Sequence, residues 1–453
     1  MTRPLRPGLL LALLLTAPLA DARSLLIEDV TVLDGSGAPA IEDASVLVKD
    51  ERIAQIARGT ISAPGAERID GGGGFLVPGL MDVHVHLAGG TRVDKEGLRK
   101  AAMDEARGIR ALHSYLYSGV TTIYDAGNNP AFIFGLRERE REGRIVSPRI
   151  LATGGIVTWP GSHGAFEGAT LVTDWPAAIP ALEEHLARGP DLVKFTYEER
   201  GWGLRPMIPR LPLPLLRHLI EYYNDHGVRS TVHVSGESRA REAIYAGVDT
   251  LAHPVIQGPV SDAFVKLMAA RRTPMASTLT IGENYSRLAE HPEFLDEPLY
   301  AATVDATERR QLLEVERPRY AADQWTWWMK LMTPVAQENL RRIVAAGGIV
   351  ALGTDQSSGP AVHRELELLV AGGIPPQDAL RIATLNAARF LGREDTLGSI
   401  AEGKIADLLL VEADPREDIR NLRRIVQVVK AGRLVDRGSL ELPVNARSRA
   451  VRP

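Results

Sequence analysis

Strand-length apolar runs alternate with helical stretches through most of this 453-residue chain, and this alternation restricts the fold more than any other feature. One helix, for example, is predicted over residues 98–118, with Gly119 as its C-terminal cap. Eight β/α repeats favour a (β/α)8 barrel of the TIM type over an open sheet, and the chain is long enough for a barrel plus a smaller module. We therefore predict an α/β fold with strands ending near His84, Asp125, Thr153, Lys194, His233, His253, Ser277 and Asp355.

Both ends of the chain carry short strand patterns in place of this alternation. Residues 24–33, 45–49 and 52–56 read as strands at the start, and residues 404–411 and 425–429 do so near the end. Two all-β segments at opposite ends indicate one discontinuous domain assembled from both. We predict a small β-sandwich from residues 23–77 and 396–442, a barrel over 78–395, and a flexible polar tail over 443–453.

The first 22 residues have the pattern of a secretory signal peptide. Arg3 and Arg6 precede a short apolar run at residues 9–19, and an A-x-A cleavage site follows at residues 20–22. The alternative is a buried N-terminal helix, which three prolines in this segment disfavour. We expect an exported protein, periplasmic or secreted, with no membrane partner once the signal is removed, because later apolar stretches are too short to span a bilayer.

Residues 282–339 form a longer interval than one crossover helix needs. The segment is charged, mostly helical in pattern, and carries Trp325, Trp327 and Trp328. Barrel enzymes build their sites at the carboxyl ends of strands, and this insertion follows such an end. It is therefore either a lid over a site, a peripheral helical unit packed on the barrel, or a surface for a partner.

Composition narrows the classes of partner and ligand. The formal net charge of -4 gives no basic excess to attract nucleic acid, so we expect none as a partner. The chain has no cysteine, which excludes disulfides, a thiolate nucleophile and Cys-based metal sites. Metal ligands would have to come from His, Asp, Glu or Lys. We expect a small-molecule or short-peptide substrate and a homo-oligomer.

His84 and His86 lie two positions apart at the end of the first predicted barrel strand. Side chains with this spacing share one face of a strand, so both imidazoles can reach one ion, and neutral imidazole suits zinc. The pair alone is weak evidence, but ionisable residues recur at other strand ends. Burying them without compensation would cost several kcal/mol each, and a shared metal site removes that cost. The further candidates are Lys194, His233, His253 and Asp355.

The chain resembles the amidohydrolase superfamily, most of all the branch of imidazolonepropionase-like and prolidase-like metal-dependent hydrolases. The resemblance covers nearly the whole chain after the signal segment. It is specific for the superfamily and much less so for the substrate. The matching segments are residues 78–86, 119–127, 147–152, 347–355, 363–367, 383–388 and 403–408.

The resemblance implies a role for each ligand candidate. His84 and His86 would bind the more buried of two divalent ions, with zinc expected, and His233 and His253 would bind the second. Lys194, carboxylated on its amine, would bridge the two. Asp355 would bind the first ion and take the proton of the bridging water. Imidazolonepropionases use one metal and lack this lysine, so Lys194 favours the two-metal, peptidase-like members.

The chemistry of such a site is amide hydrolysis. Two divalent ions that share a water generate hydroxide near neutral pH, and Asp355 acts as base and then as acid to the leaving amine. His163, on the loop after the third strand, would hydrogen-bond the carbonyl or its oxyanion; a simple loop histidine is the alternative. Weaker candidates for substrate binding are Tyr124, Tyr197, Ser235 and His363.

Three positions near the expected pocket depart from the family pattern. Ser235 stands where relatives often carry a second histidine, Pro254 where glycine is usual, and Tyr124 where many have arginine. The leading hypothesis is therefore a hydrolase for a dipeptide or an N-acyl amino acid. The alternatives are an amidase for an aromatic or xenobiotic amide such as an ochratoxin-like compound, and a cyclic amide or lactone hydrolase. A non-enzymatic binding protein with the same fold is a further class, although the ligand set is complete.

Overall fold

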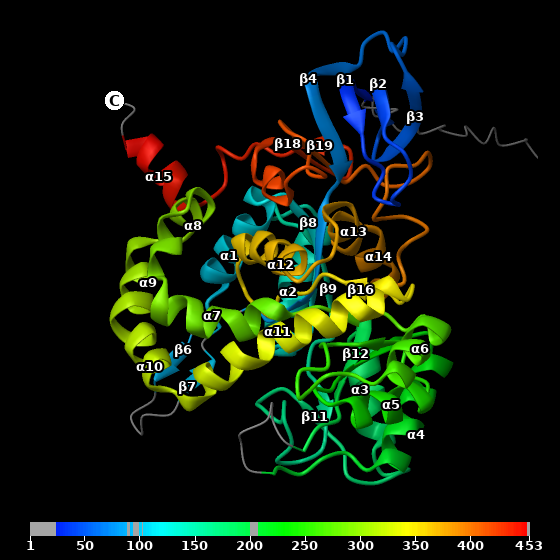
Figure 1. Ribbon diagram of the computed structural model, residues 1–453, viewed down its shortest axis with the longest axis vertical. Helices are drawn as coiled ribbons and strands as arrows, with labels where there is room; N and C mark the ends of the chain where they lie inside the picture. Colours follow the sequence, from blue (N-terminus) through cyan, green and yellow to red (C-terminus); the bar gives the residue numbers. More distant parts are fainter. Residues whose placement is uncertain (1–23, 88–90, 94–98, 102, 200–206, 451–453) are drawn as a thin grey trace, which may run out of the picture.

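The computed structural model describes residues 24–87, 91–93, 99–101, 103–199 and 207–450. The predicted signal peptide lies outside these residues. A β-sheet built from both chain ends stands above a body of parallel strands and helices, and a cluster of helices extends to one side (Figure 1). Within the described part of the chain, every helix falls short of the length and apolar character that a bilayer crossing requires.

The two ends of the chain meet in one seven-stranded sheet. Strand β1 lies between β2, with which it pairs antiparallel, and β4, with which it pairs parallel (Figure 1). Strand β4 pairs antiparallel with β17. The hydrogen bonding is that of a single sheet with register shifts in β1, whereas the sequence predicted a two-sheet sandwich. The strands, in sheet order, are β19 (Arg433–Leu434), β18 (Ile425–Lys430), β17 (Leu408–Val411), β4 (Glu67–Pro78), β1 (Ser24–Val32), β2 (Ile41–Lys49) and β3 (Arg52–Arg58).

Strand β4 leads through a single residue, Gly79, into the first strand of the body. A Cβ atom at Gly79 would lie 2.3 Å from the hydroxyl oxygen of Thr121, so only glycine allows this close approach. The end sheet is thereby coupled directly to the strand that carries His84. Apolar residues on one face of the sheet, including Leu25, Ile27 and Leu408, form its own core cluster.

Among the described residues, ten parallel strands form the body, and eight of them match the eight predicted from the sequence. The other two, β10 (Val157–Thr158) and β11 (Thr170–Leu171), extend one sheet beyond β12. Each predicted strand end falls within the observed strand or at most four residues after it, so the predicted sites sit at carboxyl ends. The eight matching strands are β5 (Leu80–Val85), β8 (Val120–Asp125), β9 (Arg149–Ala152), β12 (Leu192–Thr196), β13 (Arg229–His233), β14 (Thr250–Leu251), β15 (Met275–Ala276) and β16 (Val350–Ala351).

These strands are divided between two hydrogen-bonded sheets, one with β5, β8 and β9 and one with β12 to β16. Backbone hydrogen bonds join the two sheets where β16 meets β5 and where β9 meets β12. Between β16 and β5, the amide of Val83 donates to the carbonyl of Leu352 at 2.9 Å and that of Asp355 to the carbonyl of His84 at 2.7 Å. Between β9 and β12, the amide of Asp191 donates to the carbonyl of Ala152 at 2.9 Å. The strands thus follow one another in chain order in the arrangement of a (β/α)8 barrel, with individual bonds at the seams in place of full ladders.

Helices follow most of the barrel strands. Helix α1 begins at Glu105, later than the predicted residue 98, because the carboxylate of Asp104 caps it by accepting from the amide of Arg107. Residues 99–101, just before it, form strand β7, which pairs with β6 (Thr91–Val93). The predicted loose tail carries helix α15 (Pro443–Ala450), which begins at a proline suited to a first turn. The remaining helices around the barrel are α1 (Glu105–Tyr117), α2 (Pro130–Arg141), α3 (Ile179–Ala187), α4 (Leu213–Asp225), α5 (Glu237–Tyr245), α6 (Asp262–Arg271), α12 (Gly359–Ala371), α13 (Pro376–Ile382) and α14 (Leu385–Leu391).

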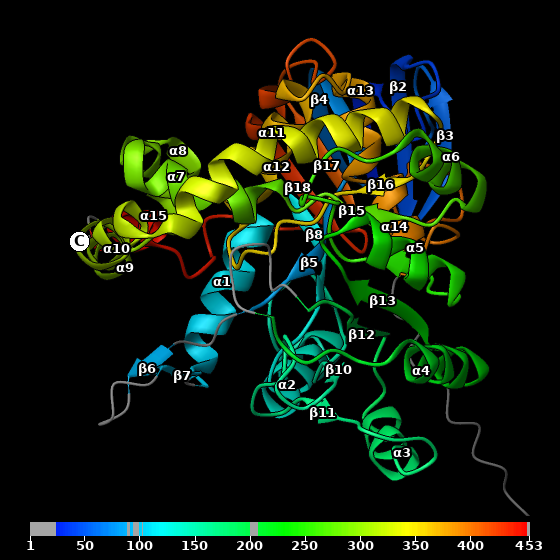
Figure 2. The same ribbon diagram turned by 60° about the horizontal axis from the view of Figure 1, so that its bottom comes forward.

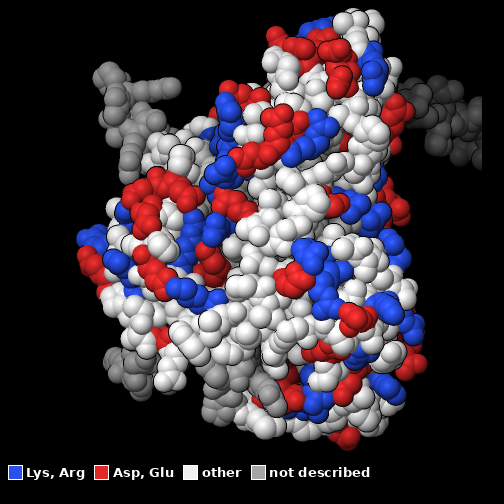
Figure 3. Space-filling view, in the orientation of Figure 1, with Lys and Arg blue, Asp and Glu red and all other residues white. Residues whose placement is uncertain are grey.

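The predicted insertion is helical and lies between β15 and β16. Helices α8, α9 and α10 gather at the side of the barrel, while α11 runs back across it (Figure 1 and Figure 2). Acidic and basic side chains are interspersed over this side of the molecule (Figure 3). The elements are α7 (Leu279–Glu290), η1 (Pro292–Asp296), α8 (Pro298–Thr303), α9 (Ala306–Gln311), η2 (Leu312–Glu316), α10 (Arg317–Ala322) and α11 (Gln324–Ala345).

The first helix of the insertion is held by a buried carboxylate of the barrel. Glu365 on α12 accepts hydrogen bonds from the amides of Leu279 at 2.8 Å and Thr280 at 2.7 Å, two of the free amides at the start of α7. It also accepts from the hydroxyl of Thr280 at 2.8 Å. The negative charge lies at the positive end of the helix, so this contact fixes where the insertion leaves the barrel.

Candidate metal centre

Three of the predicted ligands meet where β5 and the loop after β16 lie side by side. Nε2 of His84 lies 3.3 Å from Nε2 of His86 and 3.8 Å from Oδ1 of Asp355. Nε2 of His86 lies 3.4 Å from the same oxygen. Asp355 has a positive φ of 54°, a conformation that aspartate tolerates better than most residues. This backbone turn directs its carboxylate towards the two histidines.

Backbone carbonyls fix which nitrogen of each histidine faces the centre. Nδ1 of His84 lies 2.8 Å from the carbonyl oxygen of Ala252, and Nδ1 of His86 lies 2.7 Å from that of Gly127. A carbonyl can only accept, so both Nδ1 atoms carry the proton and both Nε2 atoms present a lone pair. This is the arrangement in which a histidine ligand is held by an outer partner.

Two further histidines complete a contiguous group of rings. His253 lies 4.4 Å from His84 between ring centroids, and His233 lies 4.5 Å from His253. Nδ1 of His253 is 3.0 Å from the hydroxyl of Thr278, which leaves its Nε2 towards the centre. Burial lowers the pKa of His84, His233 and His253 well below 6.5, so these imidazoles are neutral at pH 7, the form that binds metal.

Lys194 projects from β12 into the same group. Its Nζ atom lies 3.3 Å from Nε2 of His84, and the residue is 2% exposed. Burial lowers the pKa of Lys194 from 10.5 to about 7, although Asp355 and Asp125 raise it in part. A large fraction of the amine is therefore uncharged near neutral pH. The neutral amine is the form that can react with carbon dioxide to give a carbamate.

The donor set fits divalent ions. One ligand atom each from His84, His253 and Asp355 lies within 4.8 Å of the others. Imidazole nitrogens and a carboxylate are ligands that zinc prefers. The carboxyl of Asp355, whose side chain is 16% exposed, has a raised pKa because its partial burial disfavours the charge, and a cation at this position would stabilise the charged form. His233 and Lys194 adjoin the same group from β13 and β12.

His86, His233, His253, Lys194 and Asp355 line a cavity of about 340 Å³, here named the histidine cavity. His163 lines it too, with its ring stacked on that of His233 at 4.2 Å, and its carbonyl accepts from the hydroxyl of Thr196 at 2.7 Å. Part of the lining is apolar and is here named the apolar wall, and helices α7 and α11 of the insertion supply most of it. The apolar wall consists of Ile156, Phe166, Ile281, Tyr285, Trp325 and Met329.

The insertion therefore borders the candidate site, which favours the lid interpretation over a remote peripheral unit. Trp325 lines the histidine cavity and stacks on Trp328 at 5.5 Å, whereas Trp327 is 61% exposed. The three tryptophans of the sequence thus have different environments. Of these three tryptophans, Trp325 alone lines the histidine cavity.

The structure places the four predicted substrate-binding residues away from this cavity. Thr196 lines the histidine cavity, and the side chain of the next residue, Tyr197, points to the other face of the chain. The hydroxyl of Tyr197 donates to Glu242 on α5 at 2.6 Å. Tyr124 is buried within the barrel, and its hydroxyl is 3.4 Å from the carbonyl of Leu192. His363 binds the carbonyl of Ser118 at 2.8 Å between α12 and α1. These three side chains thus have partners within the protein and lie outside the lining of the histidine cavity, and their contact with substrate stays a prediction.

Ser235, the fourth, lies behind His233 rather than in the histidine cavity. Its hydroxyl accepts from Nε2 of Gln257 at 2.5 Å, and the same nitrogen donates to Glu198 at 2.9 Å. Burial raises the pKa of Glu198, while the hydrogen bond from Gln257 lowers it in part. Glu198 was not predicted from the sequence. Its position four residues after Lys194, on the same face of an extended segment, is the signal that could have found it.

Two other buried carboxylates support the ligands and were also missed. Asp82 accepts from the amide of Thr354 at 3.0 Å and its hydroxyl at 2.6 Å, which ties β5 to the loop that carries Asp355. Asp125 accepts from the amide of Leu87 at 2.8 Å and fixes the chain just after His86. The spacing of Asp82, two residues before His84, was a usable signal in the sequence.

Comparison with known proteins gives a consistent result. The model of the amidohydrolase family matches residues 75–435. Ochratoxinase of Aspergillus niger is 24% identical over 93% of this chain and 88% of its own length. Imidazolonepropionase of Streptomyces avermitilis is 25% identical over 82% and 81%. Among solved structures, a Xaa-Pro dipeptidase with bound methionine has a TM-score of 0.71 and 24% identity over 91% of this chain and 99% of its own, a likeness of fold.

Proposed function

The chain belongs to the amidohydrolase family and is a hydrolase, and from this premise we propose that it cleaves the amide C–N bond of a dipeptide or an N-acyl amino acid with the help of two divalent metal ions. The observation that carries the proposal is the position of Lys194. Its amine lies within 3.3 Å of a histidine of the group and lines the same cavity as His86, His233, His253 and Asp355.

The ligand assignments extend the geometry of the group. His84 and His86 would hold one ion together with Asp355, and His233 and His253 would hold the other. Lys194 would join the two as its carbamate, which changes a cation into an anion with two oxygen atoms. When bound, the ions, with zinc expected, lower the pKa of a water molecule and polarise the carbonyl of the amide.

We assign the proton transfer to Asp355 and the hydrogen bond to the carbonyl oxygen of the amide to His163. Asp355 is near Nε2 of both His84 and His86, where its carboxylate can take the proton of the attacking water and return it to the leaving amine nitrogen. His163 lines the same cavity, with its ring stacked on that of His233, and would hydrogen-bond the carbonyl oxygen as negative charge develops.

The apolar wall supports a substrate with a bulky apolar part. Phe166, Tyr285 and Trp325 are three aromatic side chains in one cavity, so an aromatic or large aliphatic side chain would bury its surface there. The same wall favours a second candidate, an amidase for an aromatic amide, since ochratoxinase is among the relatives. Both candidates use the same group of ligands.

The experiment is a substrate panel on chelated and zinc-reloaded protein. We expect turnover of Xaa-Pro and other dipeptides, N-acyl amino acids or aromatic amides after reloading, and none in the chelated protein. Cyclic amides and lactones belong in the same panel. Hydrolysis of lactones without any amide would contradict the proposed substrate class, and equal activity of the chelated protein would contradict the metal.

We further propose that the protein is exported and acts outside the cytoplasm, on the pattern of residues 1–22. Fractionation of cells that express the full chain tests this. The expected result is a mature form in the periplasm or medium that begins after Ala22. A full-length form retained in the cytoplasm would contradict it. The expected homo-oligomer is tested by light scattering on the mature protein.

A further inference from the structure

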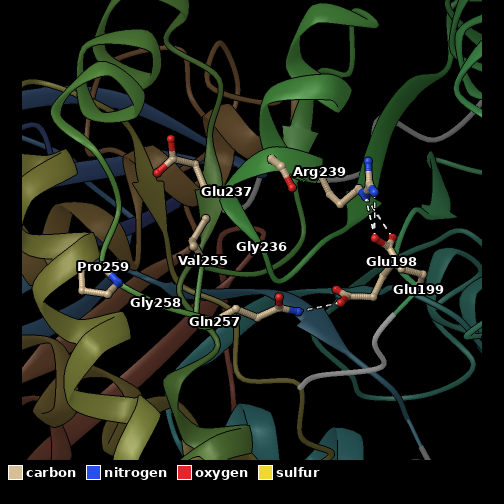
Figure 4. Close-up of a pocket in the computed structure, with 10 residues that line it drawn as sticks. Glu198, Glu199, Gly236, Glu237, Arg239, Val255, Gln257, Gly258 and Pro259 are labelled. Atoms are coloured by element: carbon tan, nitrogen blue, oxygen red, sulfur yellow. Dashed lines mark hydrogen bonds and ion pairs between the residues drawn. The ribbon is translucent and has the colours of Figure 1, made fainter. Parts of the chain in front are cut away.

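A second cavity of about 410 Å³ lies beside the candidate metal centre, at the carboxyl ends of β12, β13 and β14 (Figure 4). The loop after β12 and the start of α5 border it on one side, and the loop after β14 on the other. Glutamates dominate its charged side chains, so it is here named the glutamate cavity. Its lining includes Glu198, Glu199, Glu237, Arg239 and Gln257.

Two of the three glutamates are already paired with arginines. Glu199 accepts from Arg239 at 2.7 Å and has Arg210 at 3.2 Å, and Figure 4 shows the first of these contacts. Glu237 accepts from Arg241 at 2.8 Å and from the amide of Ser261 at 2.7 Å. Their charges are compensated within the protein and do not call for a ligand.

Glu198 differs from both. Its side chain is 3% exposed, and Oε1 accepts from Nε2 of Gln257 at 2.9 Å. Its other oxygen, Oε2, is buried and has no hydrogen-bond partner among the described residues. Nε2 of the neutral His233 lies 3.8 Å from Oε2, which is too far for a hydrogen bond. A buried carboxylate oxygen without a donor is costly unless a ligand supplies one.

The position of Glu198 joins the two cavities. It lines the glutamate cavity, and its free oxygen faces His233, which lines the histidine cavity. A group bound at this oxygen would therefore lie next to the substrate carbonyl. In a dipeptide, the α-ammonium is two bonds from the carbonyl carbon that is attacked, which suits such a short separation.

We propose that Glu198 binds the free ammonium group of the substrate and so selects dipeptides with an unblocked N-terminus over N-acylated amides. This inference rests on the proposed amide hydrolysis and narrows its substrate class. A single free oxygen suits a compact ammonium donor better than a planar guanidinium, which pairs best with both oxygens of a carboxylate. Gln257 donates to Glu198 and is itself bound to Ser235, which gives the departure at Ser235 a function.

The test uses two compounds that differ only in the amine. Alanyl-phenylalanine and propanoyl-phenylalanine share the scissile bond and the leaving group, and only the first carries an ammonium. In the zinc-loaded wild type we expect kcat/KM to be about 10- to 100-fold higher for alanyl-phenylalanine, the range that one hydrogen bond between opposite charges provides. In E198Q the preference should disappear while propanoyl-phenylalanine is cleaved as before.

Two further variants distinguish substrate binding by Glu198 from a role of Glu198 in the folded structure. E242Q removes a nearby negative charge on α5 outside the cavity lining and should keep the wild-type preference. E198D keeps the charge on a shorter side chain and should retain part of the preference, which also covers the case that E198Q does not fold. If E198Q loses zinc and slows both compounds equally, Glu198 only positions His233, and the proposal is overturned.

A binding measurement makes the result independent of turnover. Calorimetric titration of the zinc-loaded protein with alaninamide and with propanamide compares the same two groups in small ligands. Tighter binding of alaninamide that is lost in E198Q supports the ammonium site even if neither phenylalanine compound is hydrolysed, in which case the proposed reaction fails alone. Equal or unmeasurable binding of both amides in the wild type would refute the ammonium site.

Discussion

The amine of Lys194 lies 3.3 Å from Nε2 of His84, although the two residues are on strands β12 and β5. A protonated lysine would not be stable so close to a cluster of histidines without an anion or a metal to compensate it. Burial accordingly lowers the pKa of Lys194 to about 7. This relationship is the basis of the first prediction.

Replacing Lys194 with alanine should abolish the paired metal site. We expect the zinc content to fall from two ions per chain to one or none, and kcat to fall by more than the roughly 10- to 100-fold that loss of an outer partner costs. Metal analysis and steady-state kinetics measure both. Added acetate or propionate should restore part of the activity by supplying the missing carboxylate. Full activity of K194A would refute the bridging role.

The variant D355N tests the proton transfer by Asp355. Asparagine tolerates the positive φ of 54° at this position, so the backbone should be undisturbed. We expect kcat to fall by about 100- to 10,000-fold, the usual contribution of a general base, with a smaller change in KM. Zinc content must be measured alongside, since Asp355 is also a proposed ligand. A change confined to KM would argue against the base.

Trp325 and Trp327 form a matched pair for testing the insertion. Trp325 lines the histidine cavity, and Trp327 is 61% exposed. W325A should lower kcat/KM for substrates with an aromatic side chain by roughly 10-fold or more through lost apolar burial, and W327A should not. Equal effects of the two substitutions would instead indicate a general loss of helix α11.

The hydrogen bond between Thr354 and Asp82 should contribute measurably to stability. T354V removes the hydroxyl donor at 2.6 Å and leaves a fully buried carboxyl, whose pKa burial already raises to about 8, with one donor fewer. We expect a loss of about 1–3 kcal/mol in the free energy of unfolding. T354S keeps the hydroxyl and is the control. Urea unfolding of the metal-free protein compares the three forms.

His363 should make the fold sensitive to acid. Burial, with a smaller contribution from Arg423, lowers the pKa of His363 from 6.5 to about 3. Between these values the unfolded chain binds a proton that the folded protein does not, so the free energy of unfolding falls as pH falls below 6.5. H363Q should show a weaker dependence in urea melts across this range. The same substitution at the exposed His226 is the control and should match the wild type.

The sequence was sufficient to predict which residues meet at the candidate site. His84, Lys194, His233 and Asp355 lie at the ends of different strands, and parallel strands that follow one another around a barrel bring their carboxyl ends together. The period of two explains why Glu198 shares a face with Lys194 and why Tyr197 does not. The spacing in the sequence is therefore enough to distinguish Glu198 from Tyr197.

Other features depend on long-range geometry that local patterns do not contain. The sequence could not decide whether residues 282–339 cover the site, because this depends on the angle at which α7 leaves the barrel. That angle is set by Glu365, which is 85 residues from its partner Thr280. Similarly, two short all-β segments predict a shared domain but not that their strands pair in a single sheet.

The pairing of β4 with β17 has a consequence for the order of folding. Pro78 pairs with Leu408, so the open edge of β4 has to wait for nearly the whole chain to be synthesised before its partner strand exists. An unpaired edge strand is a template for association with other chains, and distant pairings form slowly. The nascent protein therefore depends on late-arriving residues to protect its earliest strands, and loss of the last part of the chain should promote aggregation rather than leave a working barrel.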